Sequence, residues 1–589
     1  MTDGCSTTLT GSTPASAVEI FALMMCRAKA VTVPWFLVIA LTCASTSAST
    51  GASVDRPAGD PAGPNRVAIV SGGYDALLLR VHLIRQAKAS IAIQTFIWTN
   101  DECGRLMICE LIEAARRGVK VRIIADHMFS DQDPDTVAFL ATVHPNFEVK
   151  HYRPSTERMK PSLFRRVLAG LRSFHELNQR MHNKVMIVDE GILLTGGRNI
   201  ENTYFDHSTG LNFRDRDVLA VGPVARAAAE SFEEYWRYRH SVSSRALADV
   251  DAAIRKGTFR RYPTRADYDF GPYFKTLDED VNAIDGAAAR FMARLRPARR
   301  VEFIADKPGK SDRSTATTAR LTGELAGMLQ RATTSVVIQT PYLVLSPPAR
   351  KLFRDIQDRH PGLRIRISTN SFASTDNIFA YSANYRLRNE YVQHLGLLVH
   401  EFKPHPASMP ALFPRFALMN ERSQATTQAG PRTRPPFLCV HAKSLVIDDQ
   451  IAFIGSYNLD PRSENLNTEV GLLIDDPALA QELRTEIERD LLPENSWVIA
   501  RRALPVGVET VNGWIDGILS LSPVDIWPIQ NTSSFELRRG ATPVPPEHPS
   551  FHQHYLEVGS FPGTDGLLST KEILTRLYKA VGAPLTPIL

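Results

Sequence analysis

Two stretches of this sequence decide the fold: MHNKVMIVD at residues 181–189 and VHAKSLVID at residues 440–448. In each, a histidine is followed two positions later by a lysine, then by a mostly apolar run and an aspartate. The second histidine lies 259 positions after the first. The same interval relates TGGRN at residues 195–199 to IGSYN at residues 454–458. His, Lys, Asp, Gly and Asn recur in register, which indicates an internal duplication.

The duplication extends upstream of these motifs. SIAIQT at residues 90–95 matches SVVIQT at residues 335–340, and each is a short apolar run typical of a buried strand. A helical stretch and a second apolar run follow in corresponding positions, namely 106–117 with 119–126 and 348–359 with 363–370. This order predicts a parallel strand pair joined by a right-handed crossover. We therefore expect an α/β protein with two similar domains, each a mixed or parallel sheet flanked by helices, related by a pseudo-twofold axis with the active site between them.

The composition is that of an ordinary globular protein. Of 589 residues, 43% are hydrophobic and 22% are charged, and the length suits two domains with additional segments. The formal net charge of +5 allows an anionic partner, such as a phospholipid surface, without requiring one. The six cysteines show no paired CxxC spacing, which argues against a disulfide framework and a zinc site.

The N-terminal region has the order of a secretory signal. Arg27 and Lys29 precede an apolar run at residues 31–44, and small residues follow it. The run is short for a membrane-spanning helix, so both cleavage and retention as an anchor stay open. The expected divisions of the chain are a signal peptide or membrane anchor at 1–50, a flexible linker at 51–66, a first domain at 67–248, a connecting segment at 249–300, a second domain at 301–490 and a C-terminal extension at 491–589.

Each repeat carries half of a phosphodiester site. Because residues i and i+2 of a strand share a face, the histidine and lysine of each motif point the same way, and the asparagine returns towards them. The predicted catalytic residues are His182, Lys184 and Asn199 in the first repeat and His441, Lys443 and Asn458 in the second. One imidazole attacks phosphorus while the other acts as general acid and then base. The lysines and asparagines hold the non-bridging oxygens, so we expect no metal ion and no cofactor.

Further residues of the repeats have supporting roles. A nucleophilic imidazole needs an acceptor that fixes its tautomer, and the candidates are Asp217 and Glu469, which open apolar strands soon after each asparagine. The first glycine of each turn motif permits a tight turn, and Asp189 and Asp448 are expected to brace local turns rather than contact phosphate. The supporting residues are Asp189, Asp448, Gly196, Gly197, Gly455 and Ser456.

These motifs resemble the signature of the phospholipase D superfamily, over roughly residues 67–476. The chain is most similar to the bacterial cardiolipin synthases of the C type. The stretches that carry this similarity are RMHNK (180–184), GGRNI (196–200), FRDRDVL (213–219), TNSFASTD (369–376), DPRS (460–463) and LNTE (466–469). The chain departs from the expected pattern at two places. Gly197 stands where the second repeat has Ser456, and Asn202-Thr203-Tyr204 stands where the synthases usually read Asp-Glu-Tyr.

The resemblance implies a function. A cardiolipin synthase transfers a phosphatidyl group between phospholipids through a phosphohistidine, with His182 as the expected nucleophile and His441 as the acid. The implied partners are a membrane surface, phosphatidylglycerol and, as a second candidate, phosphatidylethanolamine; no nucleic acid is expected, and no protein partner can be inferred. With the leader, this places the protein at the bacterial inner membrane or in the periplasm. A basic amphipathic segment at 159–174 either lies on anionic lipid or packs with a solvated basic face.

Three other functions compete with this one. A phospholipase D hydrolase would use water in place of an alcohol and release phosphatidic acid. A nuclease of the superfamily would use the same residues on DNA, but the leader and the synthase-like stretches disfavour it. A non-catalytic lipid-binding protein is a third class, and two intact His-x-Lys motifs argue against it. Sequence alone does not separate transfer from hydrolysis, because acceptor choice depends on pocket shape and water exclusion.

Overall fold

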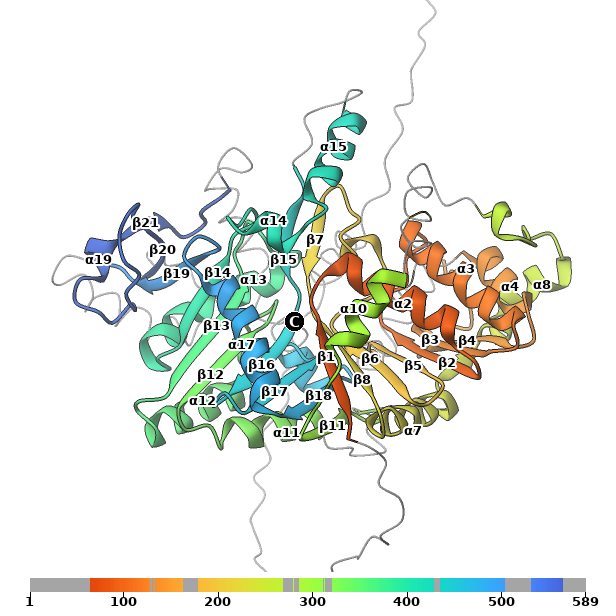
Figure 1. Cartoon of the computed structure of the whole chain (residues 1–589), viewed down its shortest axis with the longest axis horizontal. Coiled ribbons are helices and arrows are strands. Elements are labelled where there is room, and N and C mark those ends of the chain that lie inside the picture. Colours follow the sequence, from red (N-terminus) through yellow and green to blue (C-terminus); the bar gives the residue numbers. More distant parts are fainter. Residues whose placement is uncertain are drawn as a thin grey trace, which may run out of the picture. The chain divides into compact units, whose positions relative to one another are not determined.

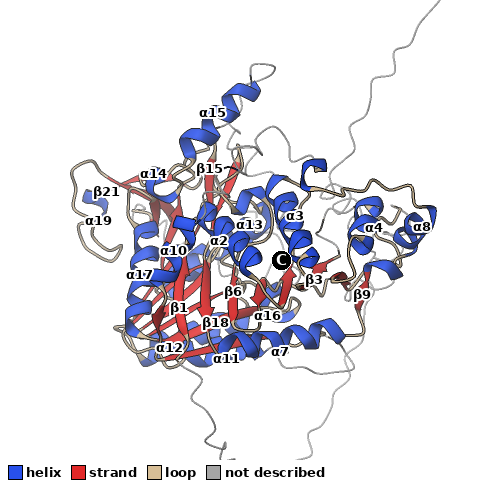
Figure 2. Ribbon diagram, turned by 45° about the vertical axis from the view of Figure 1, so that its right-hand side comes forward, coloured by secondary structure: helices blue, strands red, loops and turns tan. Residues whose placement is uncertain are grey.

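The computed structural model describes residues 64–127, 130, 133–162, 178–268, 279, 285–310, 312, 320–427, 435–503 and 531–564. The expected leader, almost all of the expected linker and most of the basic segment at 159–174 lie outside the described residues. All described residues belong to one compact unit, Ala62–Leu589. Strands and helices alternate through it, and the helices flank the strands (Figure 2). No helix in this described part is long and apolar enough to cross a membrane.

The first repeat forms a mixed sheet. Within the described residues its strand order is β10 (Arg296–Pro297), β1 (Arg66–Val70), β8 (Asp217–Val221), β6 (Ile192–Gly196), β5 (Val185–Val188), β2 (Ser90–Thr95), β3 (Lys120–Asp126), β4 (Phe147–Tyr152) and β9 (Ser241–Ser243). The strands β2, β3 and β4 are parallel, and the other neighbours are antiparallel. The predicted parallel pair around α3 (Glu102–Arg116) is therefore confirmed.

The second repeat forms the matching sheet (Figure 1). Its order, again within the described residues, is β11 (Arg300–Ala305), β18 (Val470–Asp475), β17 (Ile451–Gly455), β16 (Lys443–Ile447), β12 (Ser335–Gln339), β13 (Arg364–Asn370), β14 (Leu398–Phe402), β19 (Ser496–Arg501), β20 (Thr532–Leu537) and β21 (Tyr555–Gly559). Here β12, β13 and β14 are parallel, with α12 (Pro347–Arg359) between the first two. The expected pair of α/β domains is confirmed.

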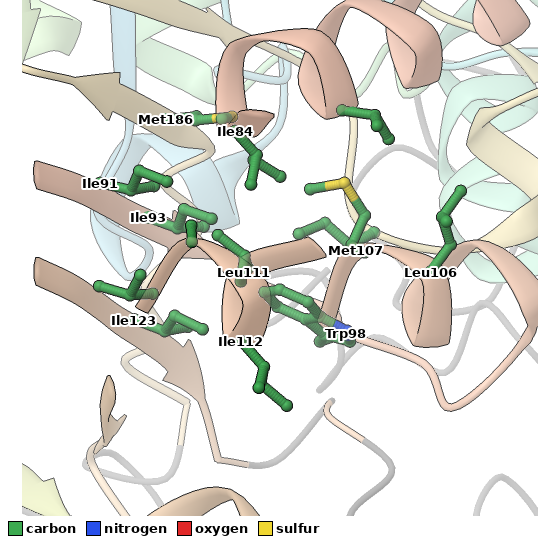
Figure 3. Packing of buried hydrophobic residues seen from close by; sticks show 14 of the residues in the cluster. Ile84, Ile91, Ile93, Trp98, Leu106, Met107, Leu111, Ile112, Ile123 and Met186 are labelled. Carbon is green, nitrogen blue, oxygen red and sulfur yellow. The ribbon is translucent and has the colours of Figure 1, made fainter. Parts of the chain in front are cut away.

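Strand alternation divides the apolar residues of each sheet between two layers. In β2, Ile91 and Ile93 face a core that they share with α2 (Gly73–Gln86) and α3, whereas Ala92 faces the opposite core. Figure 3 shows Ile91 and Ile93 packed near Ile84 of α2 and Leu111 of α3. The second sheet repeats this arrangement, because alternate residues of β12 face α11 (Arg320–Leu329) and α12 on one side and the shared core on the other.

The opposite core is common to both sheets. It contains buried residues from α7 (Val224–Arg237) and α17 (Pro477–Leu491) together with strands of both repeats. Representative members are Ile187, Val218, Phe232, Val446, Leu472 and Leu483. The two halves also pair directly, because β7 (Leu211–Arg214) and β15 (Phe437–Val440) are parallel neighbours. The halves therefore form one folded body whose central apolar layer neither half could cover alone.

The remaining helices of the described residues are mostly short. They are α4 (Pro134–Thr142), α8 (Ala248–Lys256), α10 (Asp285–Arg294), α13 (Ile378–Asn389), α14 (Met409–Leu412), α15 (Phe416–Thr427), α16 (Pro461–Asn465) and α19 (Phe551–His554), with single turns η1 (Asn202–Tyr204), η2 (Ser244–Ala246), η3 (Arg265–Asp267) and η4 (Glu390–His394). Side-chain caps set several starts. Asp101 accepts from the Gly104 N–H at the start of α3, and Ser346 accepts from the Ala349 N–H at the start of α12.

The expected domain boundaries need two corrections. The second sheet continues past residue 490 through β19, β20 and β21, so the C-terminal extension contributes strands to the second domain. The expected connecting segment ends with β10, which pairs with β1 of the first sheet. Sequence periodicity missed both features because β10 is very short and because residues 504–530 separate β19 from its partner in the sheet.

Phe535 tests whether the C-terminal strands belong to the cooperative fold. Its side chain is 2% exposed in β20 and packs with Phe551 and Tyr555. Phe535→Ala should lower the free energy of unfolding by about 3–5 kcal/mol, because it opens a cavity in this cluster. Leu556→Ala in the adjacent strand is the control, since Leu556 is 49% exposed and should cost less than about 1 kcal/mol. Chemical denaturation measures the free energy of unfolding of both variants. Equal losses in the two variants would show that β20 and β21 fold independently of the rest.

Candidate active site

The first catalytic imidazole is held from both halves of the molecule. His182 precedes β5, and its backbone N–H donates to the Thr468 carbonyl at 3.0 Å. The preceding Met181 N–H donates to the Asp126 carboxylate at 3.1 Å. The Nδ1 of His182 lies 2.8 Å and 3.0 Å from the two carboxylate oxygens of Glu469, which comes from the second repeat. Glu469 thus fixes the ring and leaves Nε2 as the nitrogen for chemistry.

The second imidazole is held in the reciprocal manner. His441 Nδ1 lies 2.6 Å from Oδ2 of Asp215, which comes from the first repeat. The His441 N–H donates to the Arg214 carbonyl at 2.9 Å. Asn370 exchanges two 2.8 Å hydrogen bonds with the backbone of Val440. Each imidazole therefore takes its orienting carboxylate from the other half.

The prediction that Asp217 orients a catalytic histidine is wrong. Asp217 forms buried ion pairs with Arg80 at 2.9 Å and Arg198 at 3.2 Å. The strand register explains the error. Gly196 pairs with Asp217 in the first sheet, whereas the matching Gly455 pairs with Gly471 in the second. The counterpart of Asp217 is therefore Gly471.

Asp215, two residues before Asp217, is the true counterpart of Glu469. Asp217 and Glu469 each open an apolar run in the sequence, and that shared feature led to their wrong pairing. The sequence nevertheless contained an alternative candidate for the orienting acid. The FRDRDVL stretch has a second aspartate, Asp215, two residues after Phe213.

The glycines are required by close packing rather than by a turn. A β-carbon on Gly196 would lie 2.3 Å from the Arg216 carbonyl oxygen, and one on Gly455 would lie 2.4 Å from that of Val470. A β-carbon on Gly197 would lie 2.1 Å from Oδ1 of Asp215.

The two orienting acids differ in length, and their neighbours differ to match. Ser456 stands where the first repeat has Gly197, and its hydroxyl donates to Glu469. Ser463 donates to the other oxygen of Glu469 at 2.8 Å. The shorter aspartate, Asp215, needs the bare glycine beside it, while the longer glutamate has room for a serine that binds it.

The lysines are buried beside the histidines. Lys184 Nζ donates to the His182 carbonyl at 2.7 Å. Lys443 Nζ lies 2.7 Å from Nδ1 and 3.0 Å from Nε2 of His441. The ring of Phe96 contacts His182 edge-on, with centroids 4.9 Å apart, and lies under Lys184 Nζ at 5.2 Å. In each motif the lysine amino group thus lies beside its histidine, and an aromatic ring contacts the first pair.

The two asparagines differ in their contacts. Asn199 accepts from the Ile97 N–H at 3.1 Å and donates to the Tyr204 hydroxyl at 2.8 Å, so it is occupied by the protein. Asn458 Oδ1 is buried without a hydrogen-bond partner among the described residues. An unsatisfied buried amide oxygen is costly, which suits a group that binds a substrate hydroxyl or water.

Tyr204 is a site residue that the sequence analysis did not identify. Its hydroxyl lies 3.4 Å from Nε2 of His441, and the two rings meet edge-on at 5.1 Å. Phe213 packs on both rings, at 4.5 Å from Tyr204 and 4.7 Å from His441. The 259-residue interval places Ser463 opposite Tyr204, so comparison of the repeats gave no indication of a shared tyrosine.

Asp189 and Asp448 lie on the turns that follow β5 and β16, both with positive φ. Asp189 accepts from the backbone N–H groups of residues 88–90, and Asp448 accepts from those of residues 333–335. Each aspartate ties its turn to the start of the neighbouring strand.

Burial dominates the electrostatics of the site. Burial, reinforced by Lys184 and Lys443, lowers the pKa of His182 well below its ordinary value. It lowers the pKa of His441 to about 4, although Asp215 opposes this, and that of Lys443 to about 8. It raises the pKa of Glu469 to about 7. Burial also lowers the pKa of Lys184 well below its ordinary value, so a phosphodiester anion beside the lysines would favour their charged forms.

Within the described residues, no group of three or more His, Cys, Asp or Glu side chains is arranged to hold a metal ion. The positive charges that act on the His182 imidazole include those of Lys184, Lys443 and Arg462. Two oriented imidazoles and two buried lysines make a site suited to phosphodiester chemistry.

Comparison with known proteins places the chain in a family. The family described as cardiolipin synthase, PLD-like domain, matches residues 81–236 and 325–491, and the chain belongs to it. The chain is 33% identical over 439 residues to an uncharacterised Helicobacter pylori protein, covering 72% of this chain and 79% of that protein. It is 30% identical over 414 residues to cardiolipin synthase C of Escherichia coli, covering 69% of this chain and 80% of that protein.

Among solved structures, the phosphatidylserine synthase of Haemophilus influenzae Rd KW20 covers 77% of this chain and 93% of its own, with a TM-score of 0.48 and 15% identity. Family membership makes this chain an enzyme, a phosphatidyltransferase of the cardiolipin synthase type.

The two aspartates near the site can be separated by experiment. Because the charge of Asp215 raises the pKa of His441, Asp215→Asn should lower that pKa. The alkaline limb of the pH–rate profile, which reports the protonated acid, should move to lower pH, and kcat at neutral pH should fall at least about tenfold. Asp217→Asn should leave the limb in place but lower the free energy of unfolding by about 3 kcal/mol, because it weakens a buried ion pair. The opposite pattern would restore Asp217 as the orienting acid.

Proposed function

We propose that this protein makes cardiolipin by transferring a phosphatidyl group from one phosphatidylglycerol to another. The observation that carries the proposal is the reciprocal pairing of His182 with Glu469 and His441 with Asp215 beside two buried lysines. The similarity to cardiolipin synthase C of Escherichia coli supports the choice of product. The substrates are phospholipids, with phosphatidylethanolamine as a second donor candidate.

His182 is the proposed nucleophile. Burial lowers the pKa of both imidazoles, but the Asp215 carboxylate opposes this shift at His441, which favours His441 as the group that carries a proton. Bound phosphate adds negative charge beside His441 and raises its pKa. In the first step, the N–P bond to Nε2 of His182 forms and the P–O bond to the head-group alcohol breaks. The proton on Nε2 of His441 passes to the departing oxygen, and the glycerol leaves.

The second step reverses these roles. The hydroxyl of a second phosphatidylglycerol gives its proton to Nε2 of His441, and its oxygen attacks phosphorus. The N–P bond to His182 breaks, which releases cardiolipin and restores the neutral nucleophile. Lys184 and Lys443 stabilise the charge on the non-bridging oxygens in both steps. If water replaced the second lipid, the product would be phosphatidic acid, which is the hydrolase alternative.

A membrane location completes the proposal. The order of charged, apolar and small residues at 27–48 favours an exported or anchored protein, at the inner membrane or in the periplasm of a bacterium. An enzyme whose two substrates are lipids gains from being held at one surface. The basic residues between 158 and 172 would then strengthen contact with anionic headgroups, by roughly 1 kcal/mol for each positive charge near the surface.

The product identifies the reaction. Full-length protein incubated with phosphatidylglycerol vesicles should release glycerol and cardiolipin in equal amounts, because each transfer frees one head group. Lipid mass spectrometry and a glycerol assay measure the two products, and vesicles containing phosphatidylethanolamine test the second donor. Phosphatidic acid as the sole lipid product would assign the protein to the hydrolases, and cleavage of DNA without lipid turnover would assign it to the nucleases.

The covalent step can be trapped. His182→Ala and His441→Ala should each lower kcat by at least about a thousandfold, and the double variant should be little worse, because the two groups act as one unit. With a phosphodiester whose leaving group needs no acid, the His441→Ala enzyme should still acquire phosphorus on His182. Peptide mapping locates the label. Label on His441 in the His182→Ala enzyme, with none on His182 in the reverse case, would exchange the two roles.

A further inference from the structure

We propose that Asp376 is a specificity-determining residue that binds the head group of the lipid whose alcohol leaves beside His441. The inference rests on the proposed function and adds the class of donor lipid: one whose head group carries hydrogen-bond donors, as a diol or an ammonium. Asp376 lies in the loop between β13 and α13, and its side chain is exposed.

Two side chains fix the Asp376 carboxylate. The Tyr342 hydroxyl donates to Oδ2 at 2.7 Å. The Cys439 thiol donates to Oδ1 at 3.7 Å, and Cys439 lies only two residues before His441. A carboxylate offers about four acceptor positions, so these two donors leave acceptor capacity for a ligand. The carboxylate is thus held in place, open to solvent and adjacent to the strand that leads into the catalytic motif.

Packing places Asp376 on the His441 side of the site. Cys439 belongs to a buried cluster with Tyr204 and Phe213. Both of these rings contact the His441 ring, at 5.1 Å and 4.7 Å between centroids. In support, the negative charge of Asp376 raises the pKa of both His441 and Lys443 against the larger effect of burial. His441 is the group that protonates the departing oxygen, so the head group departs towards Asp376.

The chemistry of a carboxylate selects the part of the lipid that it can bind. An anionic side chain repels the phosphoryl group, which the lysines bind instead. The hydroxyls of a glycerol head group donate hydrogen bonds to it, and so does the ammonium of ethanolamine. A head group with no donor, such as a methyl ester, gains nothing from Asp376.

The loop that carries Asp376 is braced by the C-terminal extension. Phe561 packs against Phe372 with centroids 5.5 Å apart, and a β-carbon on Gly563 would lie 3.4 Å from that of Ala373. Within the loop, the Ser374 hydroxyl donates to the Phe402 carbonyl at 3.0 Å. A rigid loop positions its carboxylate before the lipid arrives, as a specificity residue requires.

The test compares donors that differ only in head group. Tracer amounts of head-group-labelled phosphatidylglycerol, phosphatidylethanolamine or phosphatidylmethanol are placed in vesicles of unlabelled phosphatidylglycerol, and release of the label is followed. Wild-type protein should release glycerol or ethanolamine at least about tenfold faster than methanol. Asp376→Asn should reduce that preference by about tenfold. Asp358→Asn, on an exposed carboxylate of α12, should leave it unchanged.

The outcomes distinguish the inference from the function on which it rests. If Asp376→Asn slows all donors equally and keeps the wild-type preference, Asp376 acts only through the charge of His441 and the inference is overturned. A wild-type enzyme with no preference over phosphatidylmethanol overturns it as well. If wild-type protein releases no head group from any lipid, the proposed function itself fails. The relative loss for glycerol and ethanolamine shows whether a diol or an ammonium is the preferred ligand.

Discussion

The whole structure depends on the exchange of carboxylates between its halves. His182 is oriented by Glu469 and His441 by Asp215, so neither half contains a complete catalytic unit. Such pairs require the two sheets to be held in fixed positions, because a hydrogen bond weakens steeply as its geometry departs from the ideal. The shared core beneath α7 and α17 and the parallel pairing of β7 with β15 supply that rigidity. The apolar layer between the halves is therefore a condition for catalysis as well as for folding.

The two repeats are not identical, and their orienting acids have different surroundings. The second repeat gives its own acid, Glu469, a serine hydroxyl on each carboxylate oxygen, whereas Asp215 in the first repeat lies against a bare glycine. Burial raises the pKa of Glu469 to about 7, while the charges of His441 and Lys443 overcome burial and lower the pKa of Asp215. An ionised Asp215 stabilises a charged His441. The two halves of the site are therefore related by the duplication but differ in their electrostatics.

The sequence predicted most of the fold and the centre of the site, because both depend on local patterns. Repeated apolar runs define the parallel strands, and the spacing of His182 and His441 marks the two motifs. The prediction failed where strand register determines which residues of the two repeats correspond. Asp217 and Asp215 are two residues apart, and only the pairing of Gly196 with Asp217 shows which of them corresponds to Glu469. Contacts between distant segments, such as the Tyr204 hydroxyl at His441, leave no periodic trace in the chain.

The buried charges make the site suited to a phosphodiester. Burial and the neighbouring lysine side chains lower the pKa of both imidazoles, which favours their neutral forms. A bound phosphodiester brings one negative charge between Lys184 and Lys443, which offsets their effect and favours protonation of His441. The bound substrate would thus favour the protonated form of His441. The rings of Phe96 and Tyr204 contact the two imidazoles edge-on, so apolar surface adjoins both reacting nitrogen positions.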